Sequence, residues 1–155
     1  HERGMLGDPN AALKRLNQII EMMRAETRDG YALMENAVFR DRLVTLQAEV
    51  HAMRMHSMRL TSGRLRGESG GLSGLIVKLQ GCELNHQLAA FAIDIMGELG
   101  VLYEDSPYLR QRGAWQYKYM FDLGLIIGGG TAQVQKNIIA ERGLGMPREP
   151  KPARA

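Results

Sequence analysis

Apolar residues recur every three or four positions along much of the chain, which is the spacing of one face of an α-helix. The first such stretch follows Asp8-Pro9, a pair that suits the cap and the first position of a helix. Its apolar face holds Leu13, Leu16, Ile20 and Met23. Asp29-Gly30 interrupts the pattern, so we predict a first helix between these two pairs.

A second and a third helix follow from the same spacing. The second ends near Leu65, and its apolar stripe is Phe39, Leu43, Leu46, Val50, Met53 and Leu60. The glycine-rich segment Gly63–Gly74 is predicted to form the loop behind it. The third helix runs from Leu75 to Gly97–Gly100 and carries apolar residues on two faces, which indicates a helix buried between neighbours.

The last part of the chain predicts two shorter helices. Ser106-Pro107 suits the start of one that passes through Trp115 to about Leu123, and the other runs from Thr131 to about Arg142. Because strand signals are almost absent, the predicted fold class is all-α, an up-down helical bundle of the four-helix-bundle type. We expect the bundle to occupy residues 1–145 and a flexible tail to occupy residues 146–155.

Composition limits the classes of function. Hydrophobic residues make up 45% of the 155 residues, which is enough for a core, and the net charge is +3. Basic and acidic residues are mixed along the predicted helices, which favours a solvated surface over a nucleic-acid interface. No apolar run approaches the length of a membrane span and no signal segment is visible, so we expect a cytoplasmic protein. The chain begins on charged residues at His1, which we interpret as a piece of a longer protein.

Candidate reactive residues are few. Cys82 is the single cysteine, which excludes an internal disulfide, and its place on an apolar stripe predicts an inert core residue. The ten methionines are predicted mostly to fill the core. The four histidines do not stand at metal-ligand spacing, so no metal site is predicted.

Gly128-Gly129-Gly130-Thr131 is the most informative local feature. Three glycines permit positive φ and close backbone approach, and Thr131 suits the cap of the following helix. A helix that starts after bare backbone offers N–H donors to an anion or to a polarised carbonyl. No lysine follows the glycines, which excludes a nucleotide P-loop. A plain glycine turn between two helices is the alternative.

The stretch Ile126–Pro147 closely resembles the C-terminal signature of acyl-CoA dehydrogenases, in which a Gly-Thr pair precedes a helix such as Asn-Ile-Ile-Ala-Glu-Arg. The ending Leu144–Arg148 resembles the family's Leu-Gly-Leu-Pro-Arg. Asp94–Gly100 stands where the family has a Gln-Ile-Phe-Gly-Gly-Asn-Gly-like turn, and His1-Glu2-Arg3 is similar to the start of its C-terminal domain. The resemblance therefore implies the all-α C-terminal domain of such an enzyme.

The resemblance also implies an activity. Enzymes of this family bind FAD and an acyl-CoA thioester, and a glutamate removes a proton from Cα while a hydride leaves Cβ for the flavin. The product is a trans-2-enoyl-CoA, and the electrons pass to an electron-transfer flavoprotein. The expected partners are thus acyl-CoA, electron-transfer flavoprotein and further subunits in a homo- or hetero-oligomer, a dimer or tetramer.

The catalytic base departs from the usual pattern. Most members carry the glutamate directly before the Gly-Thr pair, where this chain has Gly129. A minority carry it at the start of the domain, and Glu2 matches that location, so the resemblance implies Glu2 as the base. It implies Arg3 near the acyl-CoA and the Gly129 N–H near the thioester. Without the resemblance, Glu2 is a carboxylate that interacts with a helix dipole.

The implied flavin contacts are Gly130, Thr131, Gln133 and, toward a neighbouring subunit, Asp94. Asp94 replaces the family's Gln, and a carboxylate repels a pyrophosphate. The usual Arg-x-x-Phe-Gly loop is absent, and Arg40 and Arg42 are the candidates to replace its arginine. These departures leave open an alternative, a non-catalytic assembly domain that completes a neighbour's FAD site. A third reading is an unrelated four-helix bundle.

Overall fold

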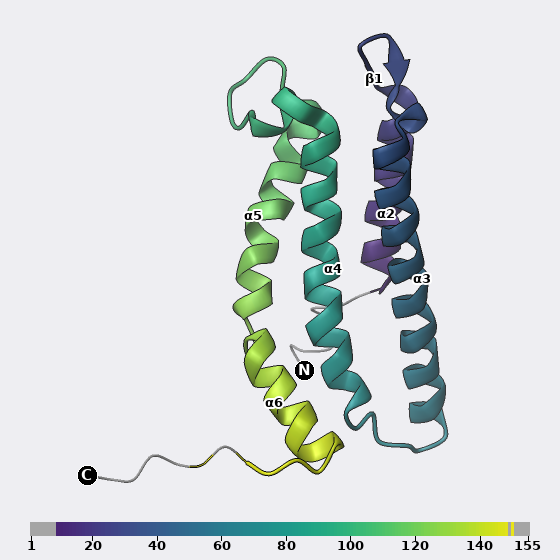
Figure 1. The fold of residues 1–155 in the computed structure, drawn as a ribbon, viewed down its shortest axis with the longest axis vertical. Coiled ribbons are helices and arrows are strands. Elements are labelled where there is room, and N and C mark those ends of the chain that lie inside the picture. The colour runs from purple at the N-terminus through teal and green to yellow at the C-terminus, as the bar shows by residue number, and fades with distance from the viewer. Residues whose placement is uncertain (1–8, 149, 151–155) are drawn as a thin grey trace, which may run out of the picture.

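The computed structural model describes residues 9–148 and residue 150, and these residues form an all-α bundle (Figure 1). The described α-helices are α2 (Pro9–Ala25), α3 (Ala37–Leu65), α4 (Ser73–Met96), α5 (Ala114–Ile127) and α6 (Ala132–Gly143). The first four run side by side, and α6 continues beyond the end of α5 (Figure 1). The predicted fold class is therefore confirmed, and none of the described helices is long and apolar enough to cross a membrane.

A short hairpin joins α2 to α3, and its first strand takes the place of the predicted end of the first helix. α2 ends at Ala25, and β1 (Thr27–Arg28) pairs with β2 (Tyr31–Ala32) in antiparallel register. Asp29 and Gly30 form the tip with φ values of 55° and 83°. Asp-Gly favours two-residue hairpin turns because such turns need positive φ at both positions. The prediction that α2 reaches Asp29-Gly30 is therefore wrong, and the 3-10 turn Leu33–Glu35 leads on to α3.

α3 agrees with its predicted stripe. The Asn36 side chain accepts a hydrogen bond from the N–H of Phe39 at 3.0 Å, which caps the helix. The buried side chains of its apolar face include Leu43, Leu46, Val50 and Met53. Gly63 lies inside the helix, so the loop to α4 is shorter than the predicted Gly63–Gly74.

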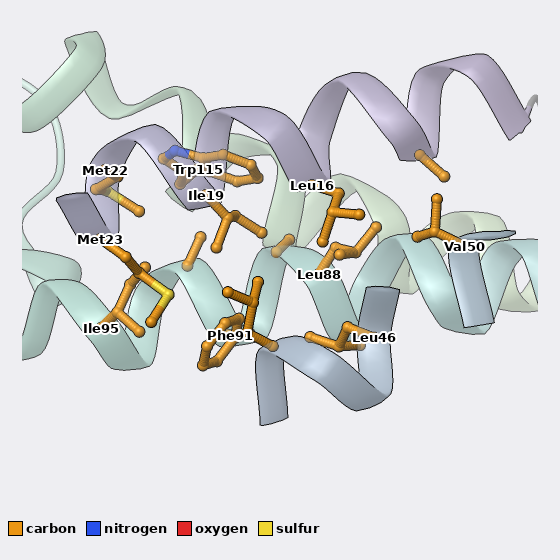
Figure 2. Close-up of a cluster of buried hydrophobic side chains, with 14 of the residues drawn as sticks. Leu16, Ile19, Met22, Met23, Leu46, Val50, Leu88, Phe91, Ile95 and Trp115 are labelled. Carbon is orange, nitrogen blue, oxygen red and sulfur yellow. The ribbon is translucent and has the colours of Figure 1, made fainter. Parts of the chain in front are cut away.

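α4 lies at the centre of the bundle, as its two apolar faces predict. Figure 2 shows Leu88, Phe91 and Ile95 of α4 between side chains of α2 and α3, with Trp115 of α5 beside them. Burial of one such side chain contributes roughly 1.5–3 kcal/mol. Cys82 is also buried in α4, and desolvation raises the pKa of its thiol, as suits an inert core residue.

The segment before α5 is irregular, and the predicted helix start at Ser106-Pro107 is wrong. The Ser106 hydroxyl accepts a hydrogen bond from the Tyr108 N–H at 3.4 Å within a turn. α5 begins only at Ala114, behind the 3-10 segment η3 (Arg110–Gly113). Gln111, Arg112 and Gly113 have φ values of 47°, 55° and 71°, and a right-handed helix cannot continue through this left-handed backbone.

The methionines divide between core and surface. Met22, Met23, Met53 and Met96 are buried, whereas Met55, Met58, Met120 and Met146 are at least half exposed. The prediction that methionines mostly fill the core holds for the first group and for Met34, which packs against the core, but not for the exposed group. Residues 1–8, 149 and 151–155 lie outside the described residues, so most of the expected tail and the boundary at residue 145 stay a prediction.

Candidate functional site

The glycine turn links α5 to α6. Gly128 donates its N–H to the carbonyl of Gly124 at 2.8 Å, and Gly130 donates its N–H to the carbonyl of Ile127 at 3.2 Å. Gly129 and Gly130 adopt φ values of 69° and 105°, which other residues rarely adopt. A Cβ on Gly130 would lie 2.8 Å from Nε2 of Gln135, so the turn also needs glycine for space.

Thr131 caps α6, as the sequence predicts. Its hydroxyl oxygen accepts from the N–H of Val134 at 3.4 Å, and its carbonyl accepts from the N–H of Gln135 at 3.0 Å. Within the described part of the chain, the N–H groups of Thr131, Ala132 and Gln133 have no partner. The turn therefore presents a row of free donors at the positive end of a helix.

Two buried polar side chains hold the turn from inside. Lys78 of α4 is 1% exposed and donates from Nζ to the carbonyls of Ile126 at 2.8 Å and Gly130 at 2.5 Å. Gln135 of α6 is fully buried and donates from Nε2 to the carbonyl of Gly129 at 3.0 Å. Neither residue is among the predicted site residues. A lysine on an apolar stripe is the sequence signal that could have revealed the first.

The predicted flavin residues lie in two places. Gly130, half-buried Thr131 and exposed Gln133 lie together at the start of α6. Asp94 lies near the other end of α4, sixteen residues after Lys78, which corresponds to about 24 Å along the helix axis. One chain therefore does not bring Asp94 to the glycine turn.

Asp94 has a cationic partner. Nη2 of Arg42 lies 2.7 Å from Oδ2 of Asp94, and the Arg42 guanidinium lies 4.9 Å from the ring centroid of Phe91. Arg42 is one of the two arginines that the sequence offered as replacements for the missing loop arginine. The pair balances the carboxylate charge that argued against a nearby pyrophosphate.

The predicted base and its neighbour, Glu2 and Arg3, lie outside the described residues. Their roles stay predictions. The correspondence of Gly129 to the usual glutamate also stays a prediction.

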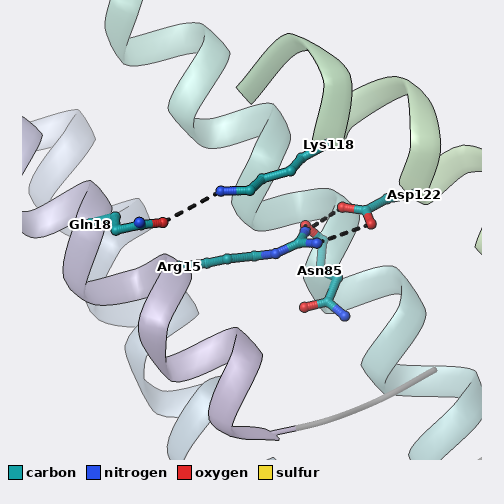
Figure 3. Close-up of polar contacts among 5 residues, drawn as sticks. All are labelled: Arg15, Gln18, Asn85, Lys118 and Asp122. Atoms are coloured by element: carbon teal, nitrogen blue, oxygen red, sulfur yellow. Dashed lines mark hydrogen bonds and ion pairs between the residues drawn. The ribbon is translucent and has the colours of Figure 1, made fainter. Parts of the chain in front are cut away.

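A partly buried polar network lies between α2, α4 and α5 (Figure 3). Arg15 pairs with both carboxylate oxygens of Asp122 and donates to the carbonyl of Asn85 at 3.1 Å. Lys118 extends toward Gln18 and lies with Nζ 4.3 Å from the ring centroid of Trp115. Burial first, and then the charge of Arg15, lowers the pKa of Lys118. The network joins three helices, and sequence reasoning did not identify it.

Two other kinds of site, a surface groove and a metal site, have less support. A groove of about 700 Å³ follows α2 and reaches Arg110, but its lining includes no residue of the glycine turn. Among residues 9–148 no group of three His, Cys, Asp or Glu side chains is arranged to hold a metal ion. The glycine turn is therefore the candidate site.

Comparison with known proteins shows the family of the chain. The family profile "Acyl-CoA dehydrogenase, C-terminal domain" matches residues 1–144. Acyl-CoA dehydrogenase IpdE1 of Mycobacterium tuberculosis is 30% identical over 152 residues, which cover 97% of this chain and 37% of that protein. The chain thus spans little more than a third of the length of this relative.

Solved structures share the fold. The ChsE4-ChsE5 complex from Mycobacterium tuberculosis has a TM-score of 0.80 at 24% identity, over 92% of this chain and 37% of the other. The FAD complex of PigA has a TM-score of 0.74 at 20% identity, over 88% of this chain and 33% of the other. The family match covers nearly the whole described bundle, including the glycine turn. The chain therefore belongs to the acyl-CoA dehydrogenase family and corresponds to its C-terminal domain.

Proposed function

We propose that this chain is the C-terminal part of an FAD-dependent acyl-CoA dehydrogenase that oxidises an acyl-CoA thioester to the trans-2-enoyl-CoA. The observation that carries the proposal is the row of unpartnered N–H groups from Thr131 to Gln133, next to a turn without side chains. Such donors stabilise the negative charge that develops on a thioester oxygen when Cα loses its proton.

Glu2 is the proposed base. A carboxylate that is desolvated by bound substrate has a raised pKa and becomes a stronger base toward the Cα proton. We propose that Gly129, which stands where the family has its usual glutamate, leaves room for the substrate and that its N–H contacts the thioester. Arg3 is proposed to contact the acyl-CoA. FAD, when bound, accepts the hydride from Cβ.

The residues at the turn fit such a flavin. Gly130 keeps the backbone bare, Thr131 has a hydroxyl hydrogen left to donate after capping α6, and Gln133 is exposed. The FAD complex known for PigA, which shares this fold, supports FAD as the cofactor of the whole protein. Electron-transfer flavoprotein is the proposed acceptor of its electrons.

Asp94 supports an oligomer. Because about 24 Å of α4 separate it from the level of Lys78, we propose that Asp94 and its partner Arg42 contact the FAD of a neighbouring subunit. An exposed apolar face of α5 supports the same conclusion. It consists of Tyr117, Met120, Phe121 and Ile127, all at least half exposed. Aromatic residues and methionine are enriched at protein interfaces.

The alternative function is a non-catalytic assembly domain. Gly129 in place of the usual base and the apolar face of α5 favour it. The solved relative ChsE4-ChsE5 is a complex of two proteins, which supports a subunit that completes a neighbour's site. Under this alternative, Tyr117→Ser with Phe121→Ser breaks the assembly. The control Tyr31→Ser, which changes an exposed tyrosine of the hairpin, leaves it intact. Sedimentation of the full-length protein measures both.

Replacement of Glu2 by Gln in the full-length protein tests the proposed enzyme. Loss of the base is expected to lower kcat by about 10²–10⁴-fold. Glu68→Gln removes a carboxylate from an exposed ion pair and serves as the control. Retained activity in Glu2→Gln would reject Glu2 as the base, and an inactive wild type that assembles would favour the alternative.

A further inference from the structure

Lys78 is a buried cation with an unusual set of partners. Its side chain is 1% exposed, and no carboxylate pairs with it among the residues that the structure covers. Its ammonium instead donates to two main-chain carbonyls, those of Ile126 and Gly130. Removal of a charge from water is costly, so these partners must compensate for the lost hydration.

The position of Lys78 explains the compensation. Ile126 lies in the last turn of α5, where carbonyls have no partner within the helix and the helix dipole is negative. A cation at this end is therefore stabilised by the free carbonyls and the negative dipole of the last turn. Gly130 is four residues further along, so the same ammonium joins the end of α5 to the glycine turn.

Because a peptide group is planar, a carbonyl held from inside the turn also fixes the direction of the N–H group on the outside. In a trans peptide the carbonyl and the N–H point in opposite directions. Lys78 holds the Gly130 carbonyl inward, so the N–H of the same peptide, which belongs to Thr131, points away from Lys78. Gln135 holds the preceding carbonyl, that of Gly129, at 3.0 Å, and the N–H of that peptide, which belongs to Gly130, donates to the Ile127 carbonyl within the turn.

The turn needs such restraint. Gly129 and Gly130 have no side chains to limit their backbone, and both adopt left-handed φ values. Two side-chain bonds from inside, one from α4 and one from α6, select a single arrangement. Oε1 of Gln135 is buried without a hydrogen-bond partner among the described atoms, so the amide is held there despite an unsatisfied oxygen.

We propose that Lys78, together with Gln135, is a positioning residue that aims the N–H groups of Thr131 and of the first turn of α6 at an oxygen of the bound ligand. The inference rests on the proposed function. The oxygen belongs to the acyl-CoA thioester or to the flavin, and the two sources predict different losses. One preorganised donor of this kind is worth about 10²–10³-fold in kcat at the oxyanion holes of acyl-transfer enzymes.

The test uses two variants of the full-length protein that keep an apolar stem. Lys78→Met removes the bonds to the carbonyls of Ile126 and Gly130, and Gln135→Met removes the bond to the carbonyl of Gly129. Leu88→Ala is the control, because it opens a cavity in the core of α4 without touching the turn. Flavin content, kcat, KM and the thermal midpoint are measured for each variant. The substrate is the acyl-CoA that the wild type oxidises fastest.

We expect both Met variants to lose at least about tenfold in kcat beyond Leu88→Ala, with a smaller change in KM, if the donors serve the thioester. If the variants instead lose flavin but keep the wild-type kcat per bound flavin, the donors serve FAD. This outcome also supports the positioning role of Lys78 and Gln135, which we call the clamp. The clamp is overturned if both variants melt earlier but match the flavin content and kcat of the control. If Lys78→Met does not fold, Gln135→Met decides.

Hydrogen exchange separates this inference from the proposed function. A clamp that orders the turn predicts faster exchange across residues 128–135 in Lys78→Met and Gln135→Met than in Leu88→Ala. Equal exchange contradicts the clamp. A wild-type protein that neither binds flavin nor oxidises any acyl-CoA contradicts the proposed function instead, and the exchange result still decides whether Lys78 orders the turn.

Discussion

Asp122 of α5 and Arg15 of α2 form an ion pair inside the bundle, where the Asp122 side chain is fully buried and the Arg15 side chain is 16% exposed. A buried pair of this kind gains little over apolar packing, because both charges lose their hydration. Removal of one partner is different, since it leaves the other charge uncompensated. The pair therefore fixes how α2 and α5 meet.

Asp122→Asn is expected to lower the free energy of unfolding by about 3–5 kcal/mol, because Arg15 then lacks its counter-charge. Urea denaturation followed by circular dichroism measures the loss. Glu21→Gln is the control: it breaks an ion pair with Arg24 in which both side chains are mostly exposed, and should cost less than about 1 kcal/mol. Equal losses in the two variants would contradict the structural role of the buried pair.

Lys118 makes the free energy of unfolding depend on pH in the alkaline range. Burial lowers the pKa of its ammonium below the usual 10.5, so the folded state releases this proton at a lower pH than the unfolded state. Between the two pKa values the unfolded state binds more protons, and this residue's contribution to stability therefore rises with pH.

Lys118→Met removes that contribution. The stability of the wild type relative to Lys118→Met is expected to increase as the pH is raised from 7 toward about 10. Denaturation curves of the two proteins at several pH values measure the difference. A wild-type advantage that falls over this interval would show that the folded state favours the ammonium.

Gly130 combines a left-handed backbone with a lack of space. Gly130→Ala is expected to destabilise the bundle by at least about 1 kcal/mol more than Gly67→Ala. Gly67 has a similarly positive φ of 79°, but no atom lies within 4 Å of a Cβ built there, whereas Gln135 lies at 2.8 Å from one on Gly130. Thermal denaturation compares the two variants. Equal losses would mean that only backbone strain, and not Gln135, constrains Gly130.

The isolated chain is expected not to hold FAD as a stable yellow 1:1 complex. The glycine turn offers donors on one side only, and Asp94 lies about 24 Å along α4 from the level of the turn. Gel filtration after incubation with FAD, read by flavin absorbance, measures retention. Co-elution at 1:1 stoichiometry would show that this domain is a complete flavin site.

Helical spacing predicted most of the fold because the apolar stripes of α3 and α4 are long and regular. It failed where short-range backbone geometry decides the structure. Asp29-Gly30 reads as a helix end and also as a hairpin turn, and only the pairing of Thr27 with Ala32 distinguishes them. The left-handed residues before α5 carry no apolar pattern at all, so Ser106-Pro107 was an attractive but wrong start.

The sequence predicted the exposed part of the candidate site but not the buried side chains behind it. Gly130 and Thr131 follow from local sequence, because the conformation and the cap they need involve neighbouring residues. A lysine on an apolar stripe draws attention to Lys78, but local sequence does not identify its partners, since the two carbonyls that it binds are 48 and 52 residues away. Arg15 and Asp122 are 107 residues apart, and a sequence gives no spacing rule for such a pair.

The central claim is that the whole protein oxidises an acyl-CoA with Glu2 as its base. Anaerobic mixing of the full-length flavoprotein with acyl-CoA, followed by flavin absorbance and by analysis of the thioester, tests it most directly. We predict that the wild type loses its oxidised-flavin absorbance and forms one trans-2-enoyl-CoA per flavin, and that Glu2→Gln does so at least about 100-fold more slowly. Unchanged flavin in the wild type, or equally fast bleaching in Glu2→Gln, would contradict the account.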